Sequence, residues 1–260
     1  MLTKAKLRLI RSLENRKWRR ESQLFVAEGP KLVGELASKV ECHYLLFSQS
    51  WAEANEQQRQ RLCMACGQPE EDVVSNGDFG RASLLQTPQG VLALFRIPTY
   101  TIDPIQAMTT RLNLVLDGVQ DPGNLGTIVR LADWFGISDI WCSTDTADVW
   151  NPKAVQASMG GIARVRVHYL NISATLAQLP PSTPRYATAL DGESLWTAPL
   201  QERGVIVMGN EGRGVSQEVG AYCDQRLLIP PYPPEHATTD SLNVGVATAI
   251  VLAEFRRRFS

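Results

Sequence analysis

Residues 111–137 read RLNLVLDGVQDPGNLGTIVRLADWFGI and decide the fold class of this chain of 260 residues. The apolar run 112–116 predicts a buried strand, and residues 117–124 are rich in turn formers. Apolar residues from Leu125 to Ala132 then recur at helical spacing. Open α/β sheets place their ligands at such strand–loop–helix units, beside the carboxyl end of the strand. The stretch therefore predicts an α/β fold with a ligand site in this loop.

The loop and the first helical turns carry the candidate site residues of this stretch. Gly123 and Gly126 allow a ligand to approach the backbone closely, Asn124 is placed to cap the helix, and Arg130 falls about two turns further along. A class I Rossmann methyltransferase or a dinucleotide enzyme would have a Gly-x-Gly-x-x-Gly turn here, which this segment lacks. The residues by themselves also allow a nucleotide-binding turn of no particular type.

A second glycine-rich turn lies further along the chain. The apolar run 204–208 predicts another buried strand, and it leads directly into GNEGRG at residues 209–214. Glycine-rich turns expose backbone N–H groups, which bind phosphates or carboxylates equally well. This turn by itself predicts an anion-binding loop and indicates no particular reaction.

The third segment joins the last predicted strand, residues 226–229, to a final helix predicted over residues 243–259. It contains LIP at residues 228–230 and, after a loop, SLNV at residues 241–244. Ser241 or Asn243 is placed to cap the final helix, which is an ordinary role for such residues.

In this order, the three segments resemble the motifs of the SpoU (TrmH) family of RNA ribose 2′-O-methyltransferases, a branch of the SPOUT superfamily. Residues 121–130 match its D-P-x-N-x-G-x-x-x-R pattern, and the other two segments match G-x-E-G-x-G and I-P…S-L-N-V. The resemblance implies a parallel α/β sheet whose C-terminal segment is threaded as a trefoil knot. It also implies a homodimer that uses S-adenosylmethionine as its cofactor.

The resemblance further implies which residues form the site. The catalytic residues would be Asn124, Arg130, Glu211, Ser241 and Asn243, and the cofactor-binding residues would be Met208, Gly209, Asn210, Ile229 and Leu242. Arg130 corresponds to the arginine that is proposed in the family to activate the 2′-hydroxyl. Because a guanidinium is a poor base, we expect Arg130 to orient and polarise the ribose oxygen, or to pair with the adjacent phosphate. We expect Glu211 to hold Arg130 by a charge-assisted pair.

The loop at residues 231–240 departs from the family pattern. The family bridges Ile-Pro and Ser-Leu-Asn with a short loop that holds a glycine, whereas this loop is longer, has no glycine and is stiffened by Pro233 and Pro234. Because the loop is expected to line the cofactor pocket, the shape of that pocket is expected to differ. His236 in this loop is either a proton acceptor or an exposed loop histidine.

The N-terminal part predicts a separate small domain. Strands and helices alternate over residues 1–95, and the segment beginning FVAEGPKLVGE at residue 25 resembles the small α/β RNA substrate-binding domain that many SpoU enzymes carry. Residues 96–107 contain two prolines and no periodicity, which predicts a linker. Residues 108–260 are then the methyltransferase domain. Lys153, in another SpoU-like run, is either an RNA phosphate contact or an exposed helix lysine.

Charge and cysteine content limit the partners and the compartment. The formal net charge is −1, but residues 1–20 hold eight Lys or Arg against one acidic residue, which predicts a basic helix over residues 3–20 and a contact with RNA phosphates. The five cysteines are irregularly spaced, so we expect no zinc or other metal site and a reducing, cytoplasmic location. No apolar run approaches transmembrane length, so we expect no membrane partner.

The basic leading domain favours ribosomal RNA over tRNA as the substrate, by analogy with SpoU members that lack such a domain. Two alternatives remain open: a tRNA ribose methyltransferase, and an RNA-binding relative that has lost the transfer reaction. A metabolic enzyme with a nucleotide cofactor is disfavoured, because the chain has neither a dinucleotide fingerprint nor a Walker lysine after residue 214.

Overall fold

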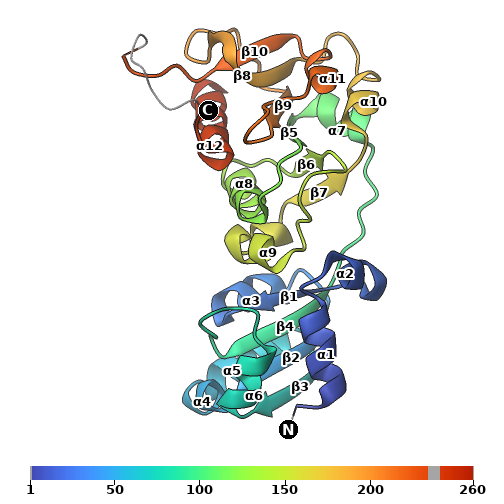
Figure 1. Ribbon diagram of the computed structural model, residues 1–260, viewed down its shortest axis with the longest axis vertical. Coiled ribbons are helices and arrows are strands. Elements are labelled where there is room, and N and C mark those ends of the chain that lie inside the picture. The colour runs from blue at the N-terminus through green and yellow to red at the C-terminus, as the bar shows by residue number, and fades with distance from the viewer. Residues whose placement is uncertain (1, 234–240, 260) are drawn as a thin grey trace. The chain divides into compact units, whose positions relative to one another are not determined.

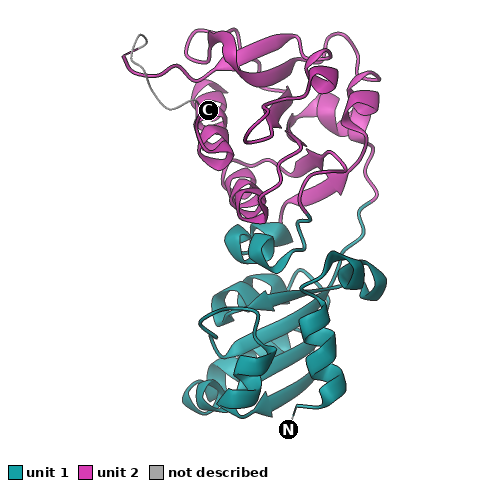
Figure 2. Ribbon diagram, viewed as in Figure 1, with its two compact units in different colours: residues 1–100, 148–163 teal, residues 101–147, 164–260 magenta. Residues whose placement is uncertain are grey.

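The structure is a computed structural model that describes residues 2–233 and 241–259. Two compact units make up the chain (Figure 2): residues 1–100 with 148–163 form unit 1, and residues 101–147 with 164–260 form unit 2. Among the described residues, no helix is long and apolar enough to cross a membrane.

Unit 1 is built on a four-stranded sheet in the order β1-β4-β2-β3, in which β2 and β3 are parallel and the other pairs antiparallel. Its strands are β1 (Leu24–Glu28), β2 (Cys42–Ser48), β3 (Glu70–Val74) and β4 (Val91–Arg96). Its helices are α1 (Lys4–Ser12), α2 (Arg16–Ser22), α3 (Pro30–Ala37), α4 (Gln49–Ala54), α5 (Glu56–Ala65), α6 (Asn76–Ala82), α9 (Pro152–Ser158) and the short η1 (Gly161–Ala163).

The single basic helix predicted over residues 3–20 is two helices in the structure. α1 ends at Ser12, and Asn15 caps α2 by accepting a hydrogen bond from the Lys17 backbone N–H at 2.8 Å. A capping Asn competes with helix continuation, which explains the break. Ile10 and Leu13 are fully buried in the core of unit 1, whereas Trp18 on α2 is half exposed.

The sequence patterns predict neither β3 nor α6. β3 reads EEDVV and pairs only with β2, so it lies at an edge of the sheet. Its three consecutive acidic residues give no strand signal, because a strand is usually predicted from apolar residues at alternate positions. Charged residues at an edge strand are expected, since they discourage pairing with another chain.

Residues 148–163 pack within unit 1, although the sequence boundaries place them in the methyltransferase domain. The Trp150 ring lies 4.6 Å from the Phe25 ring on β1, measured between centroids. The Arg19 side chain, 2 % exposed, pairs with Asp148 at 2.6 Å and also donates to the backbone oxygens of Leu13 and Glu14. This segment is therefore fastened to unit 1 by a buried ion pair and an aromatic contact.

Unit 2 contains a fully parallel six-stranded sheet in the order β10-β8-β9-β5-β6-β7. Its strands are β5 (Leu112–Asp117), β6 (Asp139–Cys142), β7 (Arg166–Tyr169), β8 (Arg185–Ser194), β9 (Gly204–Gly209) and β10 (Gln225–Leu228). Its helices are α7 (Pro104–Thr110), α8 (Pro122–Trp134), α10 (Ile172–Leu176), α11 (Gln217–Gly220) and α12 (Val244–Phe259). The predicted parallel α/β sheet is confirmed.

Both faces of this sheet are covered. Val115, Val205 and Val207 form one core layer with residues of α7, α10 and α11. Side chains alternate along a strand, so the intervening apolar residues of β5 and β9 face the opposite side, where α8 and α12 pack on each other. Figure 1 shows α8 and α12 on one side of the sheet and α7, α10 and α11 on the other. Such two-sided burial explains why β5 and β9 are continuous apolar runs.

The predicted linker 96–107 and the loop 231–240 differ from expectation or are described only in part. The predicted linker 96–107 already contains the start of α7, where Asp103 caps the helix and Pro104 occupies its first turn. The loop 231–240 is expected to line the cofactor pocket, and its residues 234–240, with His236, lie outside the described residues.

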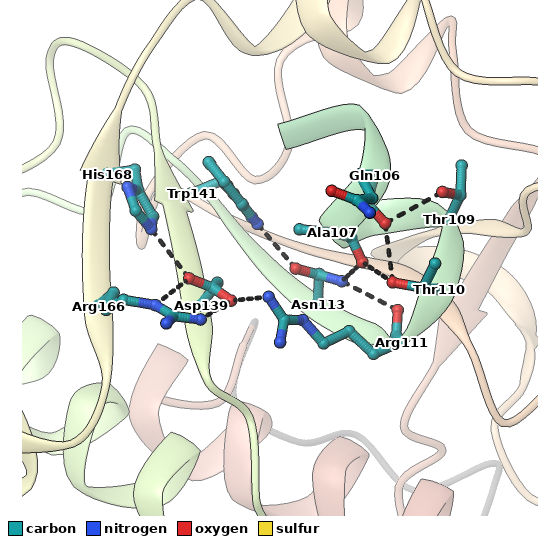
Figure 3. A network of polar contacts seen from close by, with 10 residues as sticks. All are labelled: Gln106, Ala107, Thr109, Thr110, Arg111, Asn113, Asp139, Trp141, Arg166 and His168. Carbon is teal, nitrogen blue, oxygen red and sulfur yellow. Dashed lines mark hydrogen bonds and ion pairs between the residues drawn. The ribbon is translucent and has the colours of Figure 1, made fainter. Parts of the chain in front are cut away.

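A buried carboxylate joins the amino ends of three strands (Figure 3). Asp139 opens β6, and its fully buried side chain pairs with Arg111 at 2.6 Å, Arg166 at 2.8 Å and His168 at 3.0 Å. Burial by itself would raise the pKa of Asp139, but the hydrogen bonds from His168 and Arg166 and the charges of Arg166 and Arg111 hold it well below its usual range. The His168 ring also stacks on Trp141 at 4.2 Å. Asp139 therefore ties β5, β6 and β7 together as an anion.

Replacing this carboxylate is expected to weaken unit 2 in a pH-dependent way. Asp139→Asn should lower the free energy of unfolding at pH 7 by about 2 kcal/mol, because it leaves clustered cations without their anion. A carboxylate with a depressed pKa stabilises the fold above its unfolded pKa of about 4, and that stability is lost as the pH falls. Urea unfolding at pH 7 and at pH 3.5 should show the difference between wild type and variant shrinking at the lower pH.

Asp133→Asn, which breaks the more exposed pair with Arg164, is the control and should cost less than about 1 kcal/mol. Equal losses in both variants at both pH values would contradict the assignment.

The turn after β9 leaves no room for a side chain at its first glycine. A Cβ atom on Gly209 would lie 2.1 Å from the backbone carbon of Gly214, whereas one on Gly212 would meet nothing closer than 3.7 Å. The two ends of the turn are joined by paired backbone hydrogen bonds between Asn210 and Gly214, both 2.9 Å. Close backbone approach therefore requires glycine at position 209 and not at 212.

Gly209→Ala is expected to lower the melting temperature by several degrees, because overpacking against backbone costs about 1–3 kcal/mol. Gly212→Ala, the matched control in the same turn, should melt close to the wild type. Thermal unfolding followed by circular dichroism measures both. A Gly209→Ala variant that melts like Gly212→Ala would show that the turn relaxes without cost.

Candidate active site

Parts of β8, β9 and β10 and the segments that follow β9 and β10 come together at the carboxyl edge of the unit 2 sheet. They enclose a pocket of about 690 Å³, a size typical of small-molecule sites. Its walls come from the end of β8, the turn at 209–216, the end of β10 and the start of α12. Three of these four walls are the second and third motif segments of the sequence, so the fold brings residues 209–214, 228–229 and 241–244 together.

All five predicted cofactor-binding residues line this pocket: Met208, Gly209, Asn210, Ile229 and Leu242. Met208 is buried at the end of β9, whereas Leu242 is half exposed. The lining combines aliphatic side chains with backbone of the Gly209–Gly214 turn, whose first glycine has no space for a Cβ. An adenosyl group needs an apolar slot with backbone donors and acceptors at its edge, and these residues fit that requirement.

Asn210 fixes the turn to the neighbouring strand. Its Nδ2 donates to the Gly118 carbonyl oxygen at 2.7 Å, and its Oδ1 accepts from the backbone N–H groups of Gly212 and Arg213 at 3.0 and 3.1 Å. Asp117 adds a second link, because its carboxylate accepts from the Ser216 N–H at 2.7 Å. The pocket wall is therefore held by side chains and not by the turn alone.

Asn124 joins the three motif segments in one hydrogen-bonded chain. Its Nδ2 donates to Glu211 Oε1 at 3.0 Å, and its Oδ1 accepts from Asn243 Nδ2 at 3.0 Å. Glu211 also accepts weakly from the Gln120 N–H at 3.5 Å. Of the predicted polar residues, Glu211 and Ser241 line the pocket, and Asn124 and Asn243 are hydrogen-bonded in the chain that begins at Glu211.

The predicted capping role of Asn124 is wrong. Asp121 caps α8 instead, and its carboxylate accepts from the Asn124 backbone N–H at 2.9 Å. Because Pro122 opens the helix, Asn124 lies within the first turn, and its side chain is left available for Glu211 and Asn243.

Asn243 takes the capping role that the sequence offered to either Ser241 or Asn243. Its Oδ1 accepts from the N–H groups of Gly245 and Val246 at 2.9 and 3.3 Å, at the start of α12. Its Nδ2 is the group that reaches Asn124. One amide therefore both begins the helix and belongs to the polar chain.

Arg130 does not join this group within one chain. Its side chain is exposed on α8, about 9 Å along the helix axis from Asn124 at 1.5 Å per residue. The expected pair between Glu211 and Arg130 is not formed within one chain among the described residues, where Glu211 accepts from Asn124 and from the Gln120 N–H.

The sequence reasoning missed the wall formed by residues 187–191. This is the stretch of β8 after its pairing with β9, and it lines the pocket opposite the 209–216 turn. Its Asp191 pairs with Arg226 at 2.7 Å across the rim. These residues carry none of the three motifs, and the one available signal is general, because the carboxyl edge of a parallel sheet carries ligand sites.

Among the described residues, no group of three or more His, Cys, Asp or Glu side chains is placed to hold a metal ion.

Comparisons with known proteins agree with this geometry. The model of the SpoU rRNA Methylase family matches residues 111–253, and that of the MRM3-like substrate binding domain matches residues 4–93. The 23S rRNA (guanosine(2553)-2′-O)-methyltransferase of Bacillus subtilis is 32% identical over 186 residues, 71% of each chain.

Two solved structures extend the likeness over the whole chain. One from Porphyromonas gingivalis, attributed to the TrmH family of RNA methyltransferases, has 41% identity, a TM-score of 0.83 and coverage of 99% of both chains. An AdoMet-bound rRNA methyltransferase from Sinorhizobium meliloti has 28% identity and a TM-score of 0.82, covering all of this chain and 97% of its own. Two motif segments line one pocket, the first is hydrogen-bonded to both through Asn124, and the family model spans more than half of the residues; this chain belongs to the SpoU rRNA methylase family.

Proposed function

We propose that this protein transfers a methyl group from S-adenosylmethionine to a ribose 2′-hydroxyl of RNA, with ribosomal RNA as its substrate. The observation that carries the proposal is the Asn124-centred chain, which places polar side chains of all three motifs beside the pocket. The Bacillus relative is named for a guanosine 2′-O-methylation of 23S rRNA, and we propose the same class of nucleoside here. When bound, the cofactor supplies an electrophilic methyl carbon.

The residues of the polar chain are proposed to position the ribose. In-line transfer needs the 2′-oxygen about 3 Å from the methyl carbon, so orientation supplies much of the rate. Asn124, Ser241 and Asn243 offer amide and hydroxyl groups for the ribose, and Glu211 accepts from its hydroxyls. Met208, Gly209, Asn210, Ile229 and Leu242 are proposed to hold the cofactor in the pocket that they line.

Arg130 is proposed to polarise the 2′-oxygen of a ribose that is bound next to the partner subunit's pocket. Within its own chain it lies on the exposed side of α8, away from Glu211, and it has no described polar partner. A guanidinium stabilises a developing oxyanion without itself taking the proton, which leaves to water or to a phosphate of the substrate.

The surface around Arg130 supports a homodimer. Trp134, on the same side of α8, is 83 % exposed, and Val246 on the adjoining α12 is 50 % exposed. Half-buried Ala249 and Ile250 continue this apolar surface along α12. Exposed apolar patches of this kind mark protein interfaces. We propose that α8 and α12 form the dimer interface, and that the C-terminal segment is threaded as the family's knot.

Unit 1 is proposed to hold the RNA. Lys4, Arg8, Arg11, Lys17 and Arg20 are exposed on α1 and α2. Two basic residues of the same region serve the fold instead, because Lys6 pairs with Glu70 and Asp72, and Arg19 with Asp148. We propose a substrate-binding domain over residues 1–95, a linker over 96–107 and a methyltransferase domain over 108–260, of which residues 148–163 pack within unit 1. All five cysteines are free thiols, which supports a cytoplasmic location.

The activity test is transfer of labelled methyl from S-adenosylmethionine to rRNA and to tRNA, both taken from cells that lack this protein. Label is expected in rRNA, in an alkali-resistant linkage. Arg130→Ala should lower kcat by about 10²–10³-fold with unchanged cofactor affinity, as for loss of one oxyanion-stabilising donor. Arg203→Ala, an exposed arginine at the opposite edge of the sheet, is the control and should keep full turnover.

The outcomes separate the alternatives. Label in tRNA alone would replace rRNA by tRNA as the substrate. Cofactor binding that is absent in calorimetry, together with salt-sensitive RNA binding, would indicate an inactive RNA-binding relative. Full turnover of Arg130→Ala would overturn the role of that residue.

Trp134→Glu tests the interface. Placing a charge in a desolvated apolar contact should convert the dimer to a monomer in sedimentation equilibrium, and turnover should fall with it if Arg130 acts across the interface. Trp196→Glu, which changes another partly exposed tryptophan of unit 2, should leave the dimer intact. A wild-type protein that sediments as a monomer would sink the dimer proposal.

A further inference from the structure

The helix α2 presents one tryptophan to solvent within a basic sequence. Residues 16–20 read RKWRR, and the Trp18 side chain is 49 % exposed. The other two tryptophans of unit 1, Trp51 and Trp150, are half-buried and lie against phenylalanine rings. Trp18 has no aromatic partner in the part of the chain that the structure describes, so its ring is available to a ligand.

A buried neighbour fixes the position of Trp18. The adjacent Arg19 side chain pairs with Asp148 at 2.6 Å and donates to the backbone oxygens of Leu13 and Glu14. These contacts anchor α2 within unit 1, and the tryptophan that follows Lys17 is thereby held toward solvent. A ring on an anchored helix loses less conformational freedom on binding than a ring on a mobile segment.

Lys17 and Arg20 supply positive charge beside this ring. Both side chains are exposed, and residues three apart lie on the same side of a helix. The Lys17 ammonium lies 5.8 Å from the centroid of the Trp18 ring. It is also 3.9 Å from the Glu21 carboxylate, a loose pair between exposed groups that a phosphate can replace. An aromatic ring with cations next to it is the arrangement that binds a nucleic acid base and its phosphate.

The surroundings of Trp18 favour unpaired RNA over a duplex and over a membrane surface. The bases of an A-form duplex are stacked on one another, whereas unstacked bases in loops and ends can stack on aromatic side chains. A helix that lies on a membrane needs an apolar face to insert. Trp18 is the only large apolar side chain of α2, and the preceding Ile10 and Leu13 are buried in the core of unit 1.

We infer that Trp18 stacks on an unpaired base of the RNA, while Lys17 and Arg20 pair with the neighbouring phosphates. The inference rests on the proposed function and adds the form of RNA that unit 1 receives, which is a loop, a bulge or a single-stranded end. Trp18 is a positioning residue, because it holds the substrate and touches no reacting atom. Every base has a face that can stack, so this contact selects unpaired nucleotides and not a sequence.

The test uses the full-length protein and a fluorescein-labelled RNA strand of about 12 nucleotides, single or annealed to its complement, in anisotropy titrations. Trp18→Ala should weaken binding of the single strand about tenfold, because the stacking of one base is lost. Trp18→Phe keeps a ring and should stay within about threefold of the wild type. Duplex binding should change by less than about twofold in either variant. Lys17→Ala should lower the salt dependence of single-strand binding by about 0.7 in log–log slope.

Trp196→Ala is the matched control, because Trp196 is 48 % exposed and belongs to unit 2. It should bind both RNAs like the wild type, and circular dichroism melting confirms that each variant is folded. Tryptophan fluorescence reports the stacking itself. The emission that single-stranded RNA quenches in the wild type should be absent from the Trp18→Phe variant.

The outcomes separate this inference from its alternatives. Equal losses for single strand and duplex in Trp18→Ala, or no loss for either, overturn it. Vesicles of phosphatidylglycerol and phosphatidylcholine that bind through Trp18, with RNA binding unchanged in Trp18→Ala, overturn it in favour of a membrane surface. A wild-type protein that binds the single strand through Trp18 but transfers no methyl group overturns the proposed function and supports the inference.

Discussion

The two hydrogen bonds of the Asn124 side chain constrain the whole carboxyl edge of the unit 2 sheet. Asn124 donates to Glu211 and accepts from Asn243, so one amide joins segments that are 87 and 119 residues away in sequence. Only a side chain that is both donor and acceptor can do this. An aspartate would bring a second negative charge to Glu211, and an aliphatic residue would remove both hydrogen bonds. The pocket walls depend on this link because each of the three segments is a loop or a helix start, with few ladder hydrogen bonds of its own.

Much of the fold was predictable from local pattern. The strands at 112–116 and 204–208 are buried on both faces, and such strands are recognised in the sequence as continuous apolar runs. The order of the three motifs then supplied the family. β3 was not predictable, because its EEDVV sequence suits a charged sheet edge and carries no apolar alternation. The helix break at Asn15 was not predictable from the basic composition, which is the same on both sides of it, because a capping side chain decides the boundary.

The sequence predicted which residues belong to the site better than it predicted which of them contact each other. The five cofactor-binding candidates line one pocket and Asn124, Glu211 and Asn243 touch, but motif spacing says nothing about which polar groups pair. Asp121 took the cap expected of Asn124 because Pro122 fixes the first helical position one residue later. Strand order is also long-range: β8 lies between β10 and β9, so residues 187–191 reach the pocket although no motif marks them. The ionic cluster around Asp139 could not be predicted from the sequence either, since its members belong to three separate strand segments that only the strand order brings together.

The membership of residues 148–163 in unit 1 has a consequence for the order in which the protein can mature. A chain is made from its N-terminus, and the unit 1 sheet is complete once β4 has emerged. The contacts of Phe25 with Trp150 and of Arg19 with Asp148 cannot form at that point. Their later partners are synthesised only after β5, α8 and β6 of the other unit. An isolated fragment that ends before residue 148 keeps the whole sheet and yet leaves a buried guanidinium without its carboxylate. Unit 1 is therefore complete only after part of unit 2 has been synthesised.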